Sequence, residues 1–207
     1  MKNSSSGITL VEILVVVFII GTFLMILVAD FPKIQRQFAL SRATYKFAQD
    51  LRRAQDMALS GVEIKKSGAA ETIINAKGYG VYINLADSNK QYIIYADRDD
   101  SQTYSAQDKI NCDDYDPVEN EGADCIIETV DLSKDAHGVI IKEINNTNNF
   151  NYISINFNPP NPTVSISGLE GGNRAWIVFA LESDPINSTR NVFVWKSGLI
   201  EGRPPQN

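Results

Sequence analysis

The feature that most constrains this chain of 207 residues is an apolar segment close to its N-terminus. Residues 8–29 read ITLVEILVVVFIIGTFLMILVA, a run of 22 residues in which Glu12 is the single charge. As a helix rising 1.5 Å per residue, this run spans about 33 Å, which matches the roughly 30 Å hydrocarbon core of a bilayer. It is longer than the apolar part of a secretory signal, and no small-x-small cleavage site ends it. We therefore expect a retained membrane anchor.

Composition excludes several classes of function. The chain has 19 Lys and Arg against 25 Asp and Glu, a net charge of −6. We expect no nucleic-acid partner, because phosphate contacts need clustered positive charge, although a role in DNA uptake stays open. The one histidine, His137, lies in an expected surface turn, and the glycine runs at 78–80 and 168–172 lack the spacing of a phosphate loop. We expect no catalytic residue and no enzyme activity.

The charged side chain of Glu12 is energetically unfavourable inside the apolar segment. A carboxylate inside an apolar helix costs about 2–3 kcal/mol even on the most lenient membrane-insertion scales. A partner would offset this cost, and none lies nearby in the sequence. A cut before Ile8 would create an α-amino cation at the same depth, able to pair with Glu12 of a neighbouring copy. The alternative is a plain signal anchor in which Glu12 reaches toward the lipid headgroups.

The run Gly7-Ile8-Thr9-Leu10-Val11-Glu12, with Lys2 upstream and an apolar helix downstream, resembles the class III signal of type IV pilins and type II secretion pseudopilins. In that family a prepilin peptidase cuts after the glycine and methylates the new N-terminal residue. The resemblance implies that residues 1–7 are a leader peptide and that cleavage falls between Gly7 and Ile8. It also implies that Ile8 is N-methylated and that Glu12 neutralises the amine of an adjacent subunit during assembly.

The resemblance implies a non-catalytic structural subunit of a pilin-like filament. This would be a minor pseudopilin of a type II secretion system or a minor pilin of a type IV pilus, and a competence system stays open. Its partners would be other pilin or pseudopilin subunits, the prepilin peptidase, an inner-membrane assembly platform and membrane lipid. The chain would cross the bacterial inner membrane once, with its C-terminal domain extracytoplasmic. The runs at 47–58 and 195–200 resemble the H-type minor pseudopilins and their FimT relatives.

The second reading from sequence is a membrane-anchored extracytoplasmic domain that binds a ligand, calcium or a carbohydrate, and does not polymerise. It predicts an unprocessed N-terminus and no dependence on Glu12. Both hypotheses have the same anchor and the same folded body. Cleavage of the N-terminus and assembly into filaments are the properties that distinguish them.

Residues 30–61 are expected to continue the helix of residues 8–29 in amphipathic form. Apolar side chains recur there at spacings of three and four, as on one face of a helix. Pro32 should kink the helix without ending it. Ser60-Gly61 is a signal for the C-terminal end of the helix. Residues 62–77 read as a connecting loop. Beyond them, short apolar runs between turn residues predict antiparallel strands at 80–85, 91–96, 126–132, 139–144, 152–157, 163–167, 176–181 and 191–195.

These patterns predict an α+β fold. A long N-terminal helix, membrane-spanning in its first half and amphipathic in its second, would pack on one or two antiparallel sheets. Residues 62–207 would form a β-rich globular domain with an acidic insert at 97–125. The charge is unevenly divided, since residues 30–61 carry a net +3 and residues 62–207 a net −9.

The acidic insert contains one candidate metal site. Residues 97–124 hold ten acids and two bases. Oxygen-bearing side chains alternate from residue 97, with an acid at the twelfth position, which is the spacing of an EF-hand-type calcium loop. The expected ligands are Asp97, Asp99, Ser101, Thr103 and Asp108. Gln102 replaces the usual glycine, so a solvated acidic loop without Ca²⁺ is the alternative, and no cofactor is required by the fold.

The two cysteines, Cys112 and Cys125, enclose twelve residues of the same insert. In an extracytoplasmic domain a disulfide closing such a loop contributes about 3 kcal/mol on the chain-entropy model. Two reduced thiols would suit a cytosolic protein. We expect the disulfide, on the condition that the body lies outside the cytoplasm.

Overall fold

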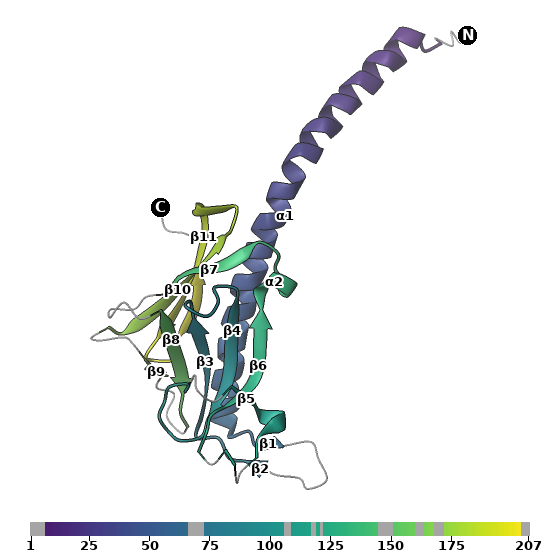
Figure 1. The fold of residues 1–207 in the computed structure, drawn as a ribbon. Coiled ribbons are helices and arrows are strands. Elements are labelled where there is room, and N and C mark those ends of the chain that lie inside the picture. The colour runs from purple at the N-terminus through teal and green to yellow at the C-terminus, as the bar shows by residue number, and fades with distance from the viewer. Residues whose placement is uncertain are drawn as a thin grey trace, which may run out of the picture. The chain divides into compact units, whose positions relative to one another are not determined.

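The computed structural model describes residues 7–65, 73–105, 109–116, 119–120, 122–144, 151–159, 164–167 and 172–203 (Figure 1). The chain divides into two compact units, Met1–Phe38 and Ala39–Asn207. The long helix α1 (Leu10–Ser60) contributes to both of them. The compact unit that contains the strands begins at Ala39 and includes the last part of the helix.

The first unit is the apolar part of α1. Residues 7–28 are all exposed, and the helix is long and apolar enough to cross a membrane. Pro32 lies inside the helix, which continues through it, as the resumption of the apolar pattern predicted. Apolar side chains left in water on this scale are unfavourable, so this unit needs lipid or other apolar helices around it.

The second unit contains two larger sheets and one short strand pair. The six-stranded sheet has the order β5-β6-β4-β3-β8-β9, and the four-stranded sheet has the order β12-β11-β10-β7. The strands of the six-stranded sheet are β3 (Gly78–Asn84), β4 (Gln91–Asp97), β5 (Ile110–Asn111), β6 (Cys125–Asp131), β8 (Tyr152–Phe157) and β9 (Val164–Ile166). Those of the four-stranded sheet are β7 (Val139–Ile144), β10 (Arg174–Leu181), β11 (Asp184–Trp195) and β12 (Ile200–Arg203), and β1 (Ile64–Lys65) pairs with β2 (Ile73–Ile74).

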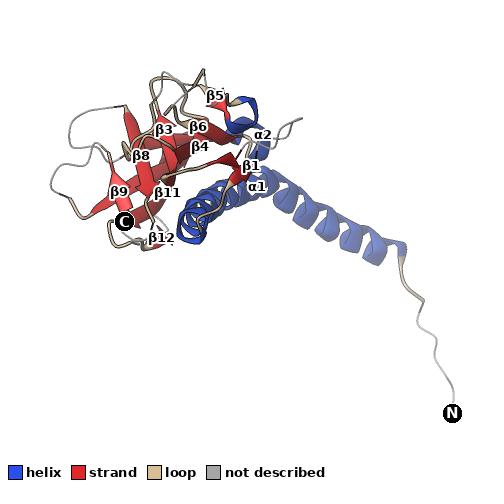
Figure 2. Cartoon of the chain, turned by 90° about the horizontal axis from the view of Figure 1, so that it is seen from below, coloured by secondary structure: helices blue, strands red, loops and turns tan. Residues whose placement is uncertain are grey.

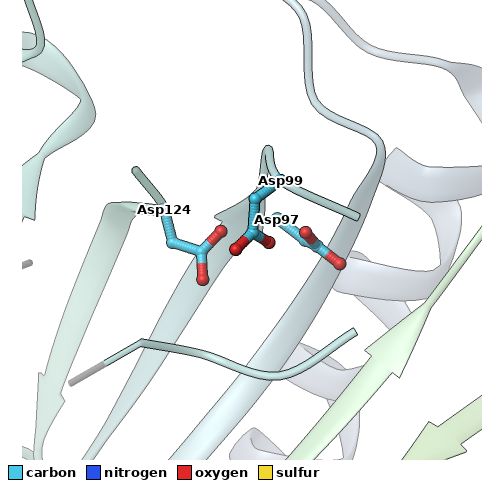
Figure 3. Close-up of side chains that lie close together, drawn as sticks. All are labelled: Asp97, Asp99 and Asp124. Atoms are coloured by element: carbon cyan, nitrogen blue, oxygen red, sulfur yellow. The ribbon is translucent and has the colours of Figure 1, made fainter. Parts of the chain in front are cut away.

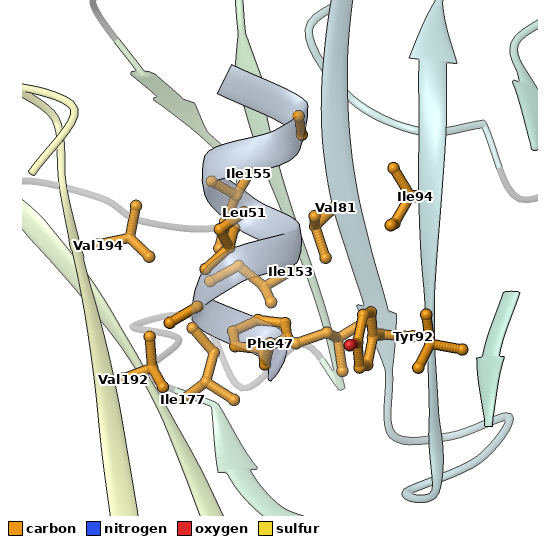
Figure 4. Packing of buried hydrophobic residues seen from close by; sticks show 14 of the residues in the cluster. Phe47, Leu51, Val81, Tyr92, Ile94, Ile153, Ile155, Ile177, Val192 and Val194 are labelled. Atoms are coloured by element: carbon orange, nitrogen blue, oxygen red, sulfur yellow. The ribbon is translucent and has the colours of Figure 1, made fainter. Parts of the chain in front are cut away.

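The C-terminal part of α1 is the centre of the body. Phe47 and Leu51 are fully buried, and they lie between side chains of the two larger sheets (Figure 4). The Phe47 ring packs edge-on against Tyr92 of β4, with 5.0 Å between ring centroids, and against Phe179 of β10 at 5.2 Å. One helix face therefore joins both sheets into a single core. In Figure 1 this part of the helix runs behind β4 and β6, and Figure 2 shows it from below, next to the strands.

Polar contacts fix the helix in this position. Asp50 is buried, and it accepts a hydrogen bond of 2.5 Å from the Tyr92 hydroxyl. Burial, and then the bond to Asp50, raise the pKa of Tyr92 above its usual range, so the hydroxyl keeps its proton at all physiological pH values. Lys46 bridges Asp50 at 3.4 Å and Asp135 of the short helix α2 (Leu132–Asp135) at 3.5 Å.

The α+β fold expected from sequence is confirmed, and so is the end of the helix. Helix α1 ends at Ser60, and Gly61 takes a positive φ of 57°, a conformation that glycine adopts without steric cost. All eight predicted strands are present, seven of them to within two residues at each end, although Thr163 lies outside the described residues. The eighth, β11, begins at Asp184, seven residues before its predicted start. The expectation of a connecting loop at 62–77 was wrong in part, because β1 and β2 pair there. The sheets are antiparallel except where β5 runs parallel to β6.

Candidate functional site

The N-terminal motif lies at the start of α1. Gly7, Ile8 and Thr9 precede the helix, which begins at Leu10. The Glu12 backbone N–H donates to the Thr9 hydroxyl oxygen at 3.3 Å and to the Thr9 carbonyl at 3.1 Å. Thr9 is therefore the N-cap, and Glu12 stands three residues after it in the first turn. Gly7 and Ile8, where the sequence places the cleavage, are both exposed.

This geometry is one half of a capping motif that sequence reasoning missed, the bond from the Glu12 backbone N–H to the Thr9 hydroxyl. Threonine followed three residues later by glutamate is a capping box, in which each residue satisfies a backbone N–H of the other. The structure contains the bond from the Glu12 backbone to Thr9. A carboxylate in the first turn also interacts favourably with the positive end of the helix dipole. The spacing of the motif was itself the signal, since Thr9-Leu10-Val11-Glu12 fits the capping pattern.

A second candidate site is a cluster of three carboxylates formed by Asp97, Asp99 and Asp124 (Figure 3). One oxygen from each lies within 4.8 Å of the others. Asp97 ends β4 and Asp124 immediately precedes β6, and the pairing of Ala96 with Cys125 brings these two strand ends together. The set can hold a metal ion, and its all-oxygen character suits a hard cation.

Backbone and side-chain donors hold the two buried carboxylates in place. Asp97 accepts hydrogen bonds from the backbone N–H groups of Asp100 and Gln102, both at 2.9 Å, and from the Asn156 side-chain amide. Asp124 accepts from the backbone N–H groups of Arg98 at 3.0 Å and Ser105 at 3.1 Å. Asp100 and Gln102 both take positive φ values, 64° and 62°, so the loop wraps tightly around Asp97.

No cation within the described residues forms an ion pair with the cluster. Arg98 separates Asp97 from Asp99 in sequence, but its guanidinium lies 4.1 Å from the Tyr115 ring centroid. Burial raises the pKa of Asp124 to about 6, and burial also raises the pKa of Asp97. Near pH 7 the cluster therefore concentrates negative charge at a poorly solvated point, which a bound cation would offset.

The structure brings together two of the predicted ligands and adds a third residue to them. Asp97 and Asp99 come together as expected, but their third partner is Asp124, from outside the alternating pattern. The Ser101 hydroxyl donates to the Thr103 carbonyl at 2.8 Å, so these two residues bond to each other within the turn. Asp108 lies outside the described residues. The pairing of β4 with β6 placed Asp124 here, and a spacing rule that reads one loop at a time does not detect it.

The rest of the insert folds against the six-stranded sheet. Cys112 and Cys125 form a disulfide, and both cysteines are buried. Tyr104, also buried, packs against Tyr82 and Tyr95 on the sheet, with ring centroids 4.9 and 5.2 Å away. The described part of the insert thus packs on the sheet through Tyr104. His137 lies exposed in the turn before β7.

The described part of the body also contains an open cavity of about 310 Å³ beside the acidic loop. Its lining is mostly polar and comes from the loop, from β9 and from the turn after β11. The lining residues are Gln102, Asn158, Val164, Ser165, Ile166 and Lys196. No protein-family model matches the chain, and no curated protein or solved structure gives a significant match.

Proposed function

We propose that this chain is a non-catalytic subunit of a pilin-like filament, anchored in the inner membrane by α1 with its body outside the cytoplasm. The observation that supports the proposal most directly is the exposed apolar part of α1, with one acid at its start and a glycine five residues before that acid. Cleavage after Gly7 by a prepilin peptidase would place an α-amino group near Glu12. Packing of such helices from many copies would bury the apolar surface that one copy leaves exposed.

Processing is the direct test of this proposal. Intact-mass and N-terminal peptide mass spectrometry of the protein from cells with an active prepilin peptidase is expected to show a chain that begins at N-methylated Ile8. A Gly7→Ala variant should retain residues 1–7, because the peptidase recognises the glycine before the cut. A wild-type chain that keeps Met1 in the same cells would contradict the proposal and favour the non-polymerising anchored domain.

We further propose that the carboxylate cluster binds Ca²⁺. Two of the three carboxylates are buried and form no ion pair in the described structure, although Arg98 interacts electrostatically with Asp124, and all three offer oxygen to one point. Ca²⁺ accepts six to eight oxygen ligands, so water and nearby carbonyl groups would complete its shell. Such binding supports either reading, because a filament subunit and an anchored ligand-binding domain can both use Ca²⁺ to hold a surface loop.

The pH dependence of stability provides the test of Ca²⁺ binding. The folded-state pKa of Asp124 is about 6, which is above its unfolded value near 4. The folded state therefore favours the protonated carboxyl group. The stability gained from this preference is fully present below pH 4 and is lost as the pH rises through 6. Without Ca²⁺ we therefore expect stability to fall between pH 4 and pH 7. Saturation at 100 times Kd would restore about 2.7 kcal/mol, a Tm rise of roughly 5–10 °C, at pH 7.5 and much less at pH 5.

The measurement is thermal unfolding of the full chain in detergent, with Ca²⁺ or with EDTA, at the two pH values. Asp124→Asn should abolish the Ca²⁺ response and reduce the loss of stability between pH 4 and pH 7, to which Asp97, with its own raised pKa, still contributes. Asp87→Asn, an exposed acid in the turn between β3 and β4, serves as the control and should preserve both. An equal Ca²⁺ response in the Asp124→Asn protein would exclude the cluster as the binding site.

A further inference from the structure

The outer face of the four-stranded sheet combines arginine with aromatic rings. Alternate residues of β10 and β11, such as Ile177 and Val192, are fully buried in the core beside α1 (Figure 4). Because side chains alternate along a strand, the residues between them point to the opposite face. The arginine–aromatic face consists of Arg174, Trp176, Phe193, Trp195 and Arg203, all partly exposed.

Strand register brings these side chains together. Arg174 lies opposite Trp195, and Trp176 lies opposite Phe193. The Arg174 guanidinium carbon is 5.1 Å from the centroid of the Phe193 ring and 5.0 Å from that of Trp195, and the Arg203 carbon is 5.6 Å from Phe193. A guanidinium stacked on a ring keeps its N–H edges available for carboxylate oxygens, and the ring shields it from water.

The positive charge on this face is only partly balanced. Arg203 forms an ion pair with Glu201 at 2.8 Å. Arg174, and Lys196 just after Trp195, have no ion-pair partner among the described residues. Arginine and tryptophan are the residue types that most often dominate binding energy at protein interfaces. The face therefore has the chemistry of a docking surface for an anionic partner.

The same chain supplies an anionic surface, opposite in sign to the arginine–aromatic face. Residues 97–124 carry a net charge of −8. Asp113 and Asp114, in the 3₁₀ helix η1 (Cys112–Asp114), are exposed, as is Glu119. None of these three acids has an ion-pair partner in the part of the chain that the structure describes. The buried disulfide fixes the start of η1, so this acidic surface is held in one place.

We propose that the arginine–aromatic face of one copy binds the acidic surface around Asp113 and Asp114 of a second copy. The inference rests on the proposed filament function. Two different surfaces of one chain make a heterologous contact, and such contacts extend into open helical assemblies when the rotation does not close a ring. Opposite charge would set the orientation in which successive bodies meet. The contact would add to the packing of apolar helices and does not involve Glu12.

Charge reversal in full-length protein tests this pairing in sheared, sedimented fibres. Arg174→Glu alone, or Asp113→Lys with Asp114→Lys, is expected to reduce the fibre-bound fraction roughly tenfold, about 1.4 kcal/mol of contact energy. A chain carrying all three changes should recover most of the loss, because every copy then presents the reversed pair. Lys142→Glu, an exposed lysine on β7 of the same sheet, is the control and should assemble normally.

These outcomes separate failure of the proposed contact from failure of the filament proposal. Normal assembly of Arg174→Glu would overturn the contact, and loss without recovery in the triple variant would assign the face to a partner other than a second copy. If Arg174→Glu does not fold, the test rests on the double variant Asp113→Lys, Asp114→Lys, which changes two exposed residues. Normal assembly of that double variant would overturn the contact. A Glu12→Gln sample in the same assay reports on the filament proposal separately.

Discussion

Replacing Glu12 by glutamine is expected to remove the protein from sheared fibres while leaving it processed, methylated and membrane-bound. Glutamine keeps the hydrogen-bonding side chain that a capping box requires, so the helix start at Thr9 should persist. It has no negative charge, so it cannot neutralise the α-amino group of a neighbouring Ile8. In a low-dielectric setting, leaving that cation unpaired costs several kcal/mol, and we expect the fibre-bound fraction to fall at least tenfold.

The matched control for this experiment changes the cap and keeps the charge. Thr9→Ala removes the hydroxyl that accepts the Glu12 backbone N–H and should cost about 1 kcal/mol of helix stability, with assembly largely retained. The fibre-bound fraction is measured by immunoblotting of sheared fibres against total membrane protein. The reverse result, a strong defect in Thr9→Ala and normal assembly of Glu12→Gln, would show that Glu12 acts only as a helix cap.

Replacing Phe47 by alanine is expected to destabilise the body more than any surface change. The side chain is fully buried, and it contacts Tyr92 on one sheet and Phe179 on the other, so its loss opens a cavity between helix and sheets. Such truncations cost about 3–5 kcal/mol. Denaturant unfolding of the full chain in detergent, followed by near-ultraviolet circular dichroism, measures the loss as a lower midpoint.

Tyr45→Ala is the control for this truncation. Tyr45 is an aromatic residue on the same helix, two positions earlier, and it is 64% exposed. Its removal should change the free energy of unfolding by no more than about 0.5 kcal/mol. Equal effects of the two variants would mean that the helix face carrying Phe47 does not face the sheets.

The elements that sequence predicted well are those with a strong local pattern. Helix α1 combines an apolar run with a three-and-four spacing and ends at Ser60 before Gly61. Strand β7 and strand β8 were predicted to the residue, because turn residues border each of them. Strand β12 and strand β5 were missed. β12 has four residues and β5 has two, and neither shows a clear alternation of apolar and polar side chains. β12 forms a strand by pairing with β11, and β5 by pairing with β6.

The two candidate sites also differ in how much of each could be predicted from the sequence. The cleavage motif is a contiguous run, so Gly7, Ile8 and Glu12 were recognisable from the sequence, and their roles remain predictions. The carboxylate cluster depends on tertiary structure, because Asp124 stands 25 residues beyond Asp99 and reaches it only through the β4–β6 register. The Ser101 hydroxyl bonds to the Thr103 carbonyl within the turn, and the roles of these two residues as metal ligands remain predictions.

The central position of the last turns of α1 has a practical consequence for preparing a water-soluble fragment of the body. Truncation at residue 61 would discard Phe47, Leu51 and Ala54, all fully buried, and would leave the inner surfaces of both sheets open to water. Such a fragment should aggregate. A fragment that starts at or just before Ala39 keeps the whole hydrophobic centre and omits most of the apolar anchor.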